Sequence, residues 1–232
     1  MKTARLALLL AALSTLAGAA EPPQTITLVN TPEPTTYRME NNWPGGALLI
    51  GVPWLLNKGR NSNLSGDLSA AMRHNTPNKL LRERLAEALT EAGFAITPDT
   101  SGVTRPNQTD LDYRAIDYGG QPFIHAYVER LGLESRGTSR AYQPMADIYF
   151  CLVVPAQSAT DCTYYDRGYV GNGYTEAAYM EFPARPQDRW TDYDDAFKHL
   201  DAVQAALEEG IGRAAKGIAK VVTQCLREKC PE

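Results

Sequence analysis

The residues of this sequence that could most readily form covalent bonds are its four cysteines: Cys151, Cys162, Cys225 and Cys230. Thiols pair into disulfides in oxidising compartments, and four cysteines allow three pairings. Zinc binding is the alternative, but the spacings lack the paired CxxC pattern and no histidine lies near them. We therefore expect two disulfides and no metal site, provided that the chain leaves the reducing cytosol.

A group of carboxylates between residues 161 and 195 is the second feature that could do chemistry. Two carboxylates at a suitable separation can hydrolyse a glycosidic bond, although acids in loops usually point into solvent. A secreted hydrolase that uses these acids is therefore our alternative function, and a small-ligand binding module is a third. The acids are Asp161, Asp166, Glu176, Glu181, Asp192, Asp194 and Asp195.

Other catalytic and cofactor motifs are missing from the sequence. The histidines His74, His125 and His199 are isolated, and no nucleophile motif such as GxSxG accompanies them. Neither phosphate-binding pattern, GxGxxG or GxxxxGK[ST], follows an apolar strand, and the DxDxDG calcium spacing is also missing. We expect no catalytic residue and no bound cofactor.

Aromatic residues are concentrated after the second cysteine, between residues 163 and 197. Tyrosine and tryptophan provide large contact areas at a small entropic cost while keeping a polar group, which suits recognition of a protein or a glycan. The alternative is that these rings simply cover the sheet. We predict that the partner-binding residues are Tyr164, Tyr169, Tyr174, Tyr179, Trp190 and Tyr193.

The N-terminus predicts export. Lys2 and Arg5 precede an apolar run at residues 6–16, which is followed by small residues at 17–20. This order is typical of a cleaved signal peptide over residues 1–20, and the apolar run is too short to span a bilayer. We expect a periplasmic or secreted mature protein with no transmembrane segment after cleavage.

The composition limits the partners of the mature chain. Its formal charge is already −4 and becomes more negative when Lys2 and Arg5 leave with the signal peptide. An acidic chain without a basic stripe argues against nucleic acid and against an anionic membrane surface. We expect an extended arm at residues 21–44 and a single domain at residues 45–232.

A hairpin at residues 145–170 would position the first pair of cysteines. Alternating apolar residues in MADIYFCLVV predict a strand with one buried face, and PAQS predicts a tight turn after it. This register places Cys151 directly opposite Cys162. It leaves Cys225 for Cys230, which can pair only if the last helix ends between them.

The remaining elements surround this hairpin. A helix from Pro77 should be capped by Thr76 and stopped by Gly93, and a final helix should follow a capping box at Thr191 and Asp194. Three glycines in that final helix, Gly210, Gly212 and Gly217, should let it lie close to the sheet. We expect strands at 25–29, 46–52, 94–97 and 123–133, a short helix at 111–118 and a long polar loop at 54–75.

Together these elements predict an α+β fold. Its sheet is mixed and mainly antiparallel, with two main helices packed on one face, in the order β-α-β-β-β-β-α.

Four stretches resemble the small α/β modules of bacterial envelope accessory proteins, namely the TolB amino-terminal domain, the curli secretion component CsgG and the LpoB activator. They are GGALLIGVP, LAEALTEAGFAI, MADIYFCLVV and GIGRAAKGIAKVV. This chain departs from those modules in lacking a lipid-attachment cysteine and in having the 54–75 loop and the cysteine pairs. The resemblance implies a non-catalytic role in assisting an envelope assembly and transfers no functional residue. We therefore expect an exported accessory or binding protein of the cell envelope.

Overall fold

The computed structural model describes residues 24–42, 52–101, 113–136, 141–157, 161–171 and 179–231. Its strands are β1 (Thr25–Leu28), β2 (Arg38–Asn42), β3 (Ala95–Thr97), β4 (Phe123–Arg136), β5 (Gln143–Val153), β6 (Tyr164–Val170) and β7 (Tyr179–Phe182). Its helices are α1 (Val52–Ala71), α2 (Pro77–Glu91), the 3₁₀ turn η2 (Tyr113–Ala115), α3 (Tyr193–Lys198) and α4 (Leu200–Arg227).

The described strands form one sheet in the order β3-β1-β4-β5-β6-β7, and β2 pairs with the second half of β4. The two longest ladders, β4 with β5 and β5 with β6, are antiparallel, and the other pairings are parallel. The predicted α+β class, with a mixed and mainly antiparallel sheet, is confirmed.

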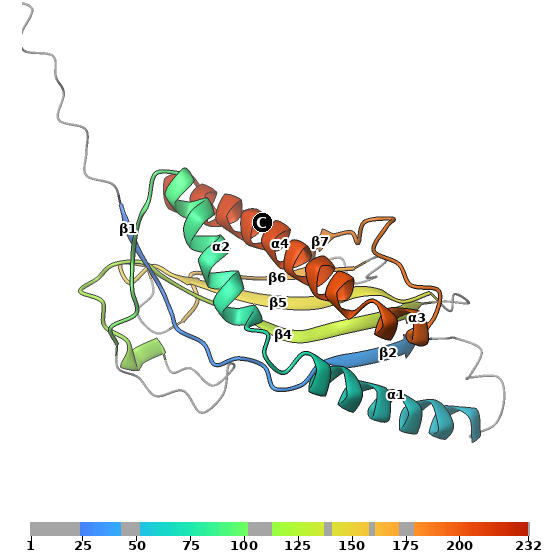
Figure 1. Ribbon diagram of the computed structural model, residues 1–232. Coiled ribbons are helices and arrows are strands. Elements are labelled where there is room, and N and C mark those ends of the chain that lie inside the picture. Colours follow the sequence, from blue (N-terminus) through green and yellow to red (C-terminus); the bar gives the residue numbers. More distant parts are fainter. Residues whose placement is uncertain are drawn as a thin grey trace, which may run out of the picture.

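The long helices α2 and α4 lie side by side across one face of this sheet (Figure 1). The sequence dictates this layer, because apolar residues recur every three or four positions along both helices. The buried stripe of α2 comprises Leu81, Leu85 and Leu89, and that of α4 comprises Val203, Leu207, Ile211, Ala214, Ile218 and Val222. The prediction of two main helices on one face is also confirmed.

Two of the three glycines in α4 allow its close approach to the sheet. A Cβ atom on Gly210 would lie 2.5 Å from Val170 Cγ1, and one on Gly217 would lie 2.6 Å from Phe182 Cζ. Both distances are shorter than van der Waals contact, so a larger residue would push the helix outward. Gly212 faces open space and has no such role.

The ends of α2 agree only partly with the sequence signals. Gly93 has φ +91 and ends the helix as predicted. The Thr76 side chain makes no capping hydrogen bond. Instead, the Glu33 carboxylate accepts hydrogen bonds from the backbone N–H groups of Asn78 (2.8 Å) and Lys79 (2.9 Å). A carboxylate at this position also interacts favourably with the helix dipole.

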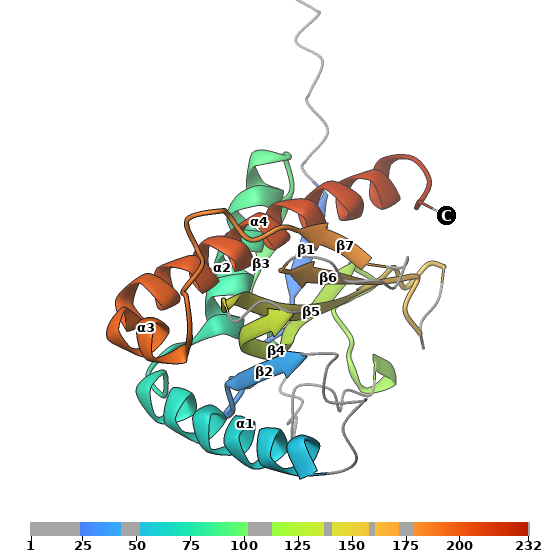
Figure 2. The same ribbon diagram turned by 90° about the vertical axis from the view of Figure 1, so that its right-hand side faces the viewer.

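The predicted loop at residues 54–75 is wrong, because most of this segment forms α1. Leu64 and Leu68 are buried along one side of the helix. Ser65 and Ser69 accept hydrogen bonds from the backbone N–H groups of Met39 (2.9 Å) and Tyr37 (2.8 Å). The helix therefore lies beside β2 at the edge of the sheet (Figure 2). Of the predicted strand at 46–52, only Val52 is described, and it begins α1.

Part of the predicted arm contributes to the sheet, since residues 24–42 supply β1 and β2. The predicted strand at 25–29 is β1, which lies between β3 and β4, and its Ile26 and Leu28 are buried. The predicted signal peptide at 1–20 lies outside the described residues. Among the helices described, none is both long enough and apolar enough to cross a membrane.

Candidate functional site

Both predicted disulfides are formed. Cys151 bonds to Cys162 with 5.4 Å between their α carbons, and Cys225 bonds to Cys230 with 4.1 Å. The second bridge can close because α4 ends at Arg227, between its two cysteines. Once oxidised, the four sulfur atoms are no longer available as thiolate ligands for zinc.

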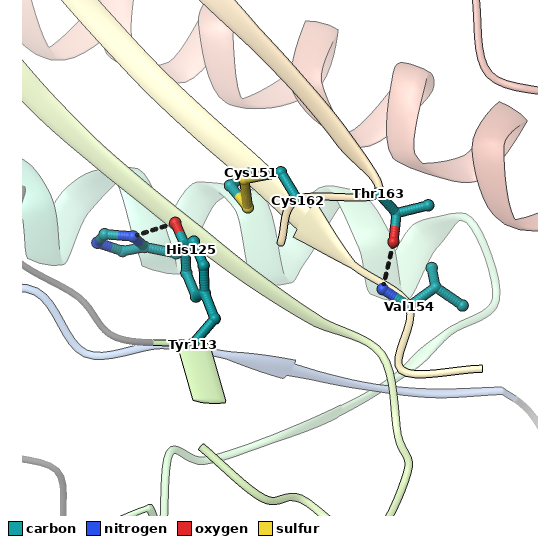
Figure 3. The surroundings of a disulfide bond; sticks show 6 residues. All are labelled: Tyr113, His125, Cys151, Val154, Cys162 and Thr163. Atoms are coloured by element: carbon teal, nitrogen blue, oxygen red, sulfur yellow. Dashed lines mark hydrogen bonds between the residues drawn. A yellow bond between two sulfur atoms is a disulfide. The ribbon is translucent and has the colours of Figure 1, made fainter. Parts of the chain in front are cut away.

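The predicted register of the hairpin is wrong. Cys151 lies opposite Tyr165, and the ladder ends at the pair Leu152 and Tyr164. Beyond it, the Val154 N–H donates to the Thr163 hydroxyl at 2.8 Å, which holds the start of β6 close to the end of β5 (Figure 3). Cys162 therefore reaches Cys151 from just outside the ladder, because the connection after Val154 is longer than a four-residue turn.

The two faces of the sheet have different coverings. Ile148, Phe150 and Leu152 of β5 belong to the core cluster that includes α2 and α4. Because successive side chains in a strand alternate, Tyr149 and Cys151 point to the opposite face. We call this second side the helix-free face, because no α-helix among the described residues packs on it. The short turn η2 lies on it, on the other side of the sheet from α2 and α4 (Figures 1 and 2).

An aromatic row crosses the helix-free face over β4, β5 and β6. We define it as Tyr127, Tyr149, Arg167 and Tyr165. The rings of Tyr127 and Tyr149 are stacked, with centroids 5.3 Å apart and an angle of 2° between their planes. The Arg167 guanidinium lies 3.9 Å from the centroid of Tyr149, so a cation–π contact continues the stack. The sheet sets this order, because Tyr149 pairs with Tyr127 on one side and Arg167 on the other.

Tyr165 is the exposed end of the aromatic row. Its ring centroid lies 5.8 Å from that of Tyr149, and its hydroxyl accepts a hydrogen bond from Arg167 Nε at 2.9 Å. Tyr165 is 51% exposed, whereas Tyr149 is 6% exposed. Among the described residues, Tyr165 is the large hydrophobic side chain that is most open to solvent. The exposed side of the Tyr165 ring can therefore contact a partner, and Tyr149 and Arg167 already hold the ring in position.

His125 lies at the buried end of the same stack. Its ring centroid is 5.1 Å from that of Tyr127, and its Nδ1 is 3.0 Å from the Tyr113 hydroxyl (Figure 3). Burial raises the pKa of Tyr113 to about 12 and also raises the pKa of Tyr127. Both phenols therefore stay neutral at physiological pH, and Arg167 supplies the charge of the aromatic row.

Two of the predicted partner-binding residues are interior. Tyr169 is fully buried, and its hydroxyl donates to Glu134 and accepts from Arg136 at 2.7 Å. Trp190 is 6% exposed, and its backbone pairs with Tyr142 in an isolated bridge. Their rings stabilise the fold and offer almost no area to a partner.

The other predicted tyrosines do not join them in one surface. Tyr164 lies on the helix side of β6, where it packs 5.9 Å from the Phe150 ring. Tyr193 packs edge-on against Phe197 at 6.2 Å, at the start of α3. Tyr174 and the side chain of Tyr179 lie outside the described residues. The aromatic row therefore shares none of the residues predicted from sequence.

Three of the carboxylates considered for hydrolysis have local structural roles. The Asp192 side chain caps α3 by accepting from the Asp195 N–H at 2.9 Å. The Thr191 N–H, together with His199, holds the pKa of Asp195 below its usual value, the opposite of what a general acid needs. Asp166 accepts from the Tyr164 hydroxyl at 3.0 Å. The exposed acids are Asp161, Glu181, Asp192 and Asp194, and Glu176 lies outside the described residues.

Comparison with known sequences returned no matching family model and no matching characterised protein. Solved structures with weak likeness include three bacterial proteins. A proposed lipoprotein from Caulobacter crescentus CB15 is 15% identical, with TM-score 0.37, over 67% of this chain and 87% of that chain. Lipoprotein GNA1162 from Neisseria meningitidis is 12% identical, with TM-score 0.29, over 67% and 88%. A proposed neuraminyllactose-binding hemagglutinin homologue from Helicobacter pylori is 12% identical, with TM-score 0.32, over 90% and 85%.

These likenesses lie among bacterial proteins, two of which are described as lipoproteins. At such identities and TM-scores they do not assign a function or a binding residue to this chain. The resemblance to the TolB, CsgG and LpoB modules stays a prediction.

Proposed function

We propose that this chain is an exported, non-catalytic accessory protein of the bacterial cell envelope, and that it binds a partner protein through the aromatic row. The observation that carries the proposal is the half-exposed Tyr165 ring, which is braced by Arg167 and Tyr149 on the helix-free face. Tyrosine and arginine are among the residues most often found at the energetic centres of protein interfaces.

The supports of the aromatic row reduce the cost of binding. Tyr149 is held between Tyr127 and Arg167, and the Cys151–Cys162 disulfide ties the start of β6 to β5 three residues before Tyr165. A side chain that is already ordered loses little rotamer entropy when a partner docks. The row therefore favours specific recognition over loose hydrophobic contact.

A protein partner fits the aromatic row better than a glycan does. Sugar rings stack on open aromatic faces, and Tyr149 cannot supply one because Tyr127 and Arg167 occupy its faces, which leaves Tyr165 as the single open ring of the row. Tyr165 offers one exposed ring beside a guanidinium, which suits a protein patch of apolar groups and carboxylates.

Two observations support the proposal that the chain is exported to the cell envelope. The order of residues 1–20 is that of a cleaved signal peptide, and both cysteine pairs form the bridges that an oxidising compartment favours.

A site-specific crosslinking experiment tests the proposal. A photoreactive phenylalanine analogue is placed at position 165 in the full chain and, as a matched control, at Lys220, an exposed residue of α4 in the opposite layer. We expect a discrete protein adduct in intact cells from position 165 that position 220 does not give. The same adduct pattern from both positions, or none from 165, would refute the proposed binding surface.

The partner recovered in this way then allows affinity to be measured. Tyr165→Ala should weaken binding about tenfold or more, as expected for an interface anchor, while thermal unfolding stays unchanged because the ring is half-exposed. Undiminished affinity in this variant contradicts the proposal even if an adduct is seen. A glycan that binds the wild type and not Tyr165→Ala would also contradict it.

A further inference from the structure

A pocket of about 160 Å³ opens on the helix side of the sheet, away from the aromatic row. It lies between the start of α2, the first half of α4 and β4. Cavities of this size hold a molecule as large as benzene. Its apolar lining is formed by Pro77, Leu80, Leu131, Leu207 and Ile211.

The pocket also contains a buried hydroxyl that lacks a hydrogen bond. Tyr37 is 2% exposed, and its phenol oxygen has no hydrogen-bond partner of ordinary geometry. The Asn75 amide is nevertheless close enough to lower the pKa of this phenol. Burial, together with the negative charges of Glu33 and Glu208 and against the opposing effect of Asn75, raises the pKa of Tyr37 to about 12, so the phenol is neutral. Buried polar groups in proteins are nearly always paired, so this oxygen is a candidate contact for a ligand.

The charged side chains around the pocket are mainly acidic. Its lining includes two acids, Glu83 and Glu208, and one base, Lys79. The Lys79 ammonium lies 3.9 Å from the Glu83 carboxylate, and Gln204 donates to Glu208 at 2.7 Å. Glu33, which holds the first N–H groups of α2, adds a further negative charge near Tyr37. The resulting potential attracts a cation and repels an anion.

We propose that this pocket binds a small organic monoamine with a compact apolar body. The apolar body fills the space between Leu131, Leu207 and Ile211. The ammonium group, which carries only donors, donates to the phenol oxygen of Tyr37 and lies close to the Glu208 carboxylate. This site is independent of the aromatic row, because it lies on the opposite side of the sheet.

Three probes of the same shape and different charge test this inference on the full chain. Benzylammonium, benzyl alcohol and benzoate are titrated and followed by ligand-observed NMR and calorimetry. We expect benzylammonium to bind most tightly, benzyl alcohol more weakly and benzoate not at all. Benzoate binding as tightly as benzylammonium would overturn the assignment, and so would the absence of benzylammonium binding.

Three substitutions locate the binding. Tyr37→Phe removes only the hydroxyl, and Glu208→Gln removes only a charge. Each should weaken benzylammonium about tenfold. Glu91→Gln, at the far end of α2, is the matched control and should change nothing.

Two further measurements test whether the compounds bind in this pocket. Benzyl alcohol should bind Glu208→Gln as it binds the wild type, which shows that the pocket is intact. Ile211→Trp fills the apolar space and should abolish binding of both compounds. Benzylammonium affinity that is unchanged in Tyr37→Phe and Glu208→Gln would place the amine elsewhere and refute the proposal.

Discussion

Substitution of Glu134 by glutamine should destabilise the protein more than any comparable change at the surface. Glu134 is fully buried on β4. Its Oε1 accepts hydrogen bonds from the Tyr169 hydroxyl and from Gln143 Nε2 (3.1 Å), and its Oε2 accepts from Arg136 Nε (2.6 Å). Burial and the Glu134 carboxylate both raise the pKa of Tyr169, so its hydroxyl remains a donor.

The magnitude follows from these contacts. The oxygen of a glutamine can still accept from Tyr169 and Gln143, but its NH₂ group then faces the Arg136 donor. The variant loses one charge-assisted hydrogen bond, worth about 1.5–3 kcal/mol, and the two bonds that remain lose their ionic character. Arg136 is 28% exposed, so water compensates part of the loss. We expect a decrease in unfolding free energy of about 2–3 kcal/mol, or about 4–12 °C in Tm.

Urea unfolding followed by circular dichroism measures this difference directly. The matched control is Glu129→Gln, an exposed acid on the same strand, which should change stability by less than about 0.5 kcal/mol. The slope of unfolding free energy against urea should be the same for all three proteins, since each exposes similar surface. A Glu134→Gln variant as stable as the Glu129→Gln control would refute our account of the buried network.

Three further predictions concern stability. Glu33→Ala should destabilise by about 1–2 kcal/mol in urea unfolding because it removes the cap of α2, whereas Thr76→Ala should have almost no effect; the reverse order would contradict the capping role. Replacing Cys151 and Cys162 together by serine should cost about 3 kcal/mol through the freed unfolded chain, and reductant should then have no additional effect at this bridge. Burial alone would raise the pKa of Asp99 above 3.8, but hydrogen bonds from a tyrosine hydroxyl and from backbone N–H groups lower it to about 2, so its contribution is present above pH 4 and is lost as the pH falls toward 2. Asp99→Asn should therefore be less stable than wild type at neutral pH, with a difference that shrinks in acid; a constant difference would contradict this.

Local periodicity predicted the elements whose packing repeats along the chain. The apolar stripe of α4 and the alternation in β4 and β5 are visible in the sequence because each buries one side over many residues. The cysteine pairing was also predictable, even though Cys151 faces Tyr165 across the ladder rather than Cys162. Cys162 lies just before β6, and its α carbon is 5.4 Å from that of Cys151, which is within the range of about 4.4–6.8 Å that a disulfide spans without direct cross-strand pairing.

Contacts between distant segments could not be predicted in this way. The helix α1 contains glycines and many polar residues, and its place depends on Ser65 and Ser69 accepting from the backbone beside β2. The capping of α2 by Glu33 has the same origin. In both cases the partner lies far away in the sequence, so no local pattern reveals it.

The candidate site escaped prediction because it depends on strand register. Tyr127 and Tyr149 lie in segments that the sequence predicted as strands, but only the true register aligns them with Arg167. Composition instead drew attention to Tyr169 and Trp190, whose burial follows from neighbours such as Glu134 and Tyr142. Knowing which residues face each other across strands matters more for locating a surface than aromatic content does.

The position of β1 and β2 in the sheet affects when the molecule can fold. Thr27 of β1 pairs with Phe123, and Arg38 of β2 pairs with Gly132. Neither strand can therefore join β4 until β4 has been synthesised and has left the ribosome. Such long-range pairings give a high contact order, and folding then takes milliseconds to seconds rather than microseconds. A nascent chain that is still unfolded can pass through a secretion channel, whereas a folded domain cannot. Slow folding is therefore compatible with the proposed export across the inner membrane.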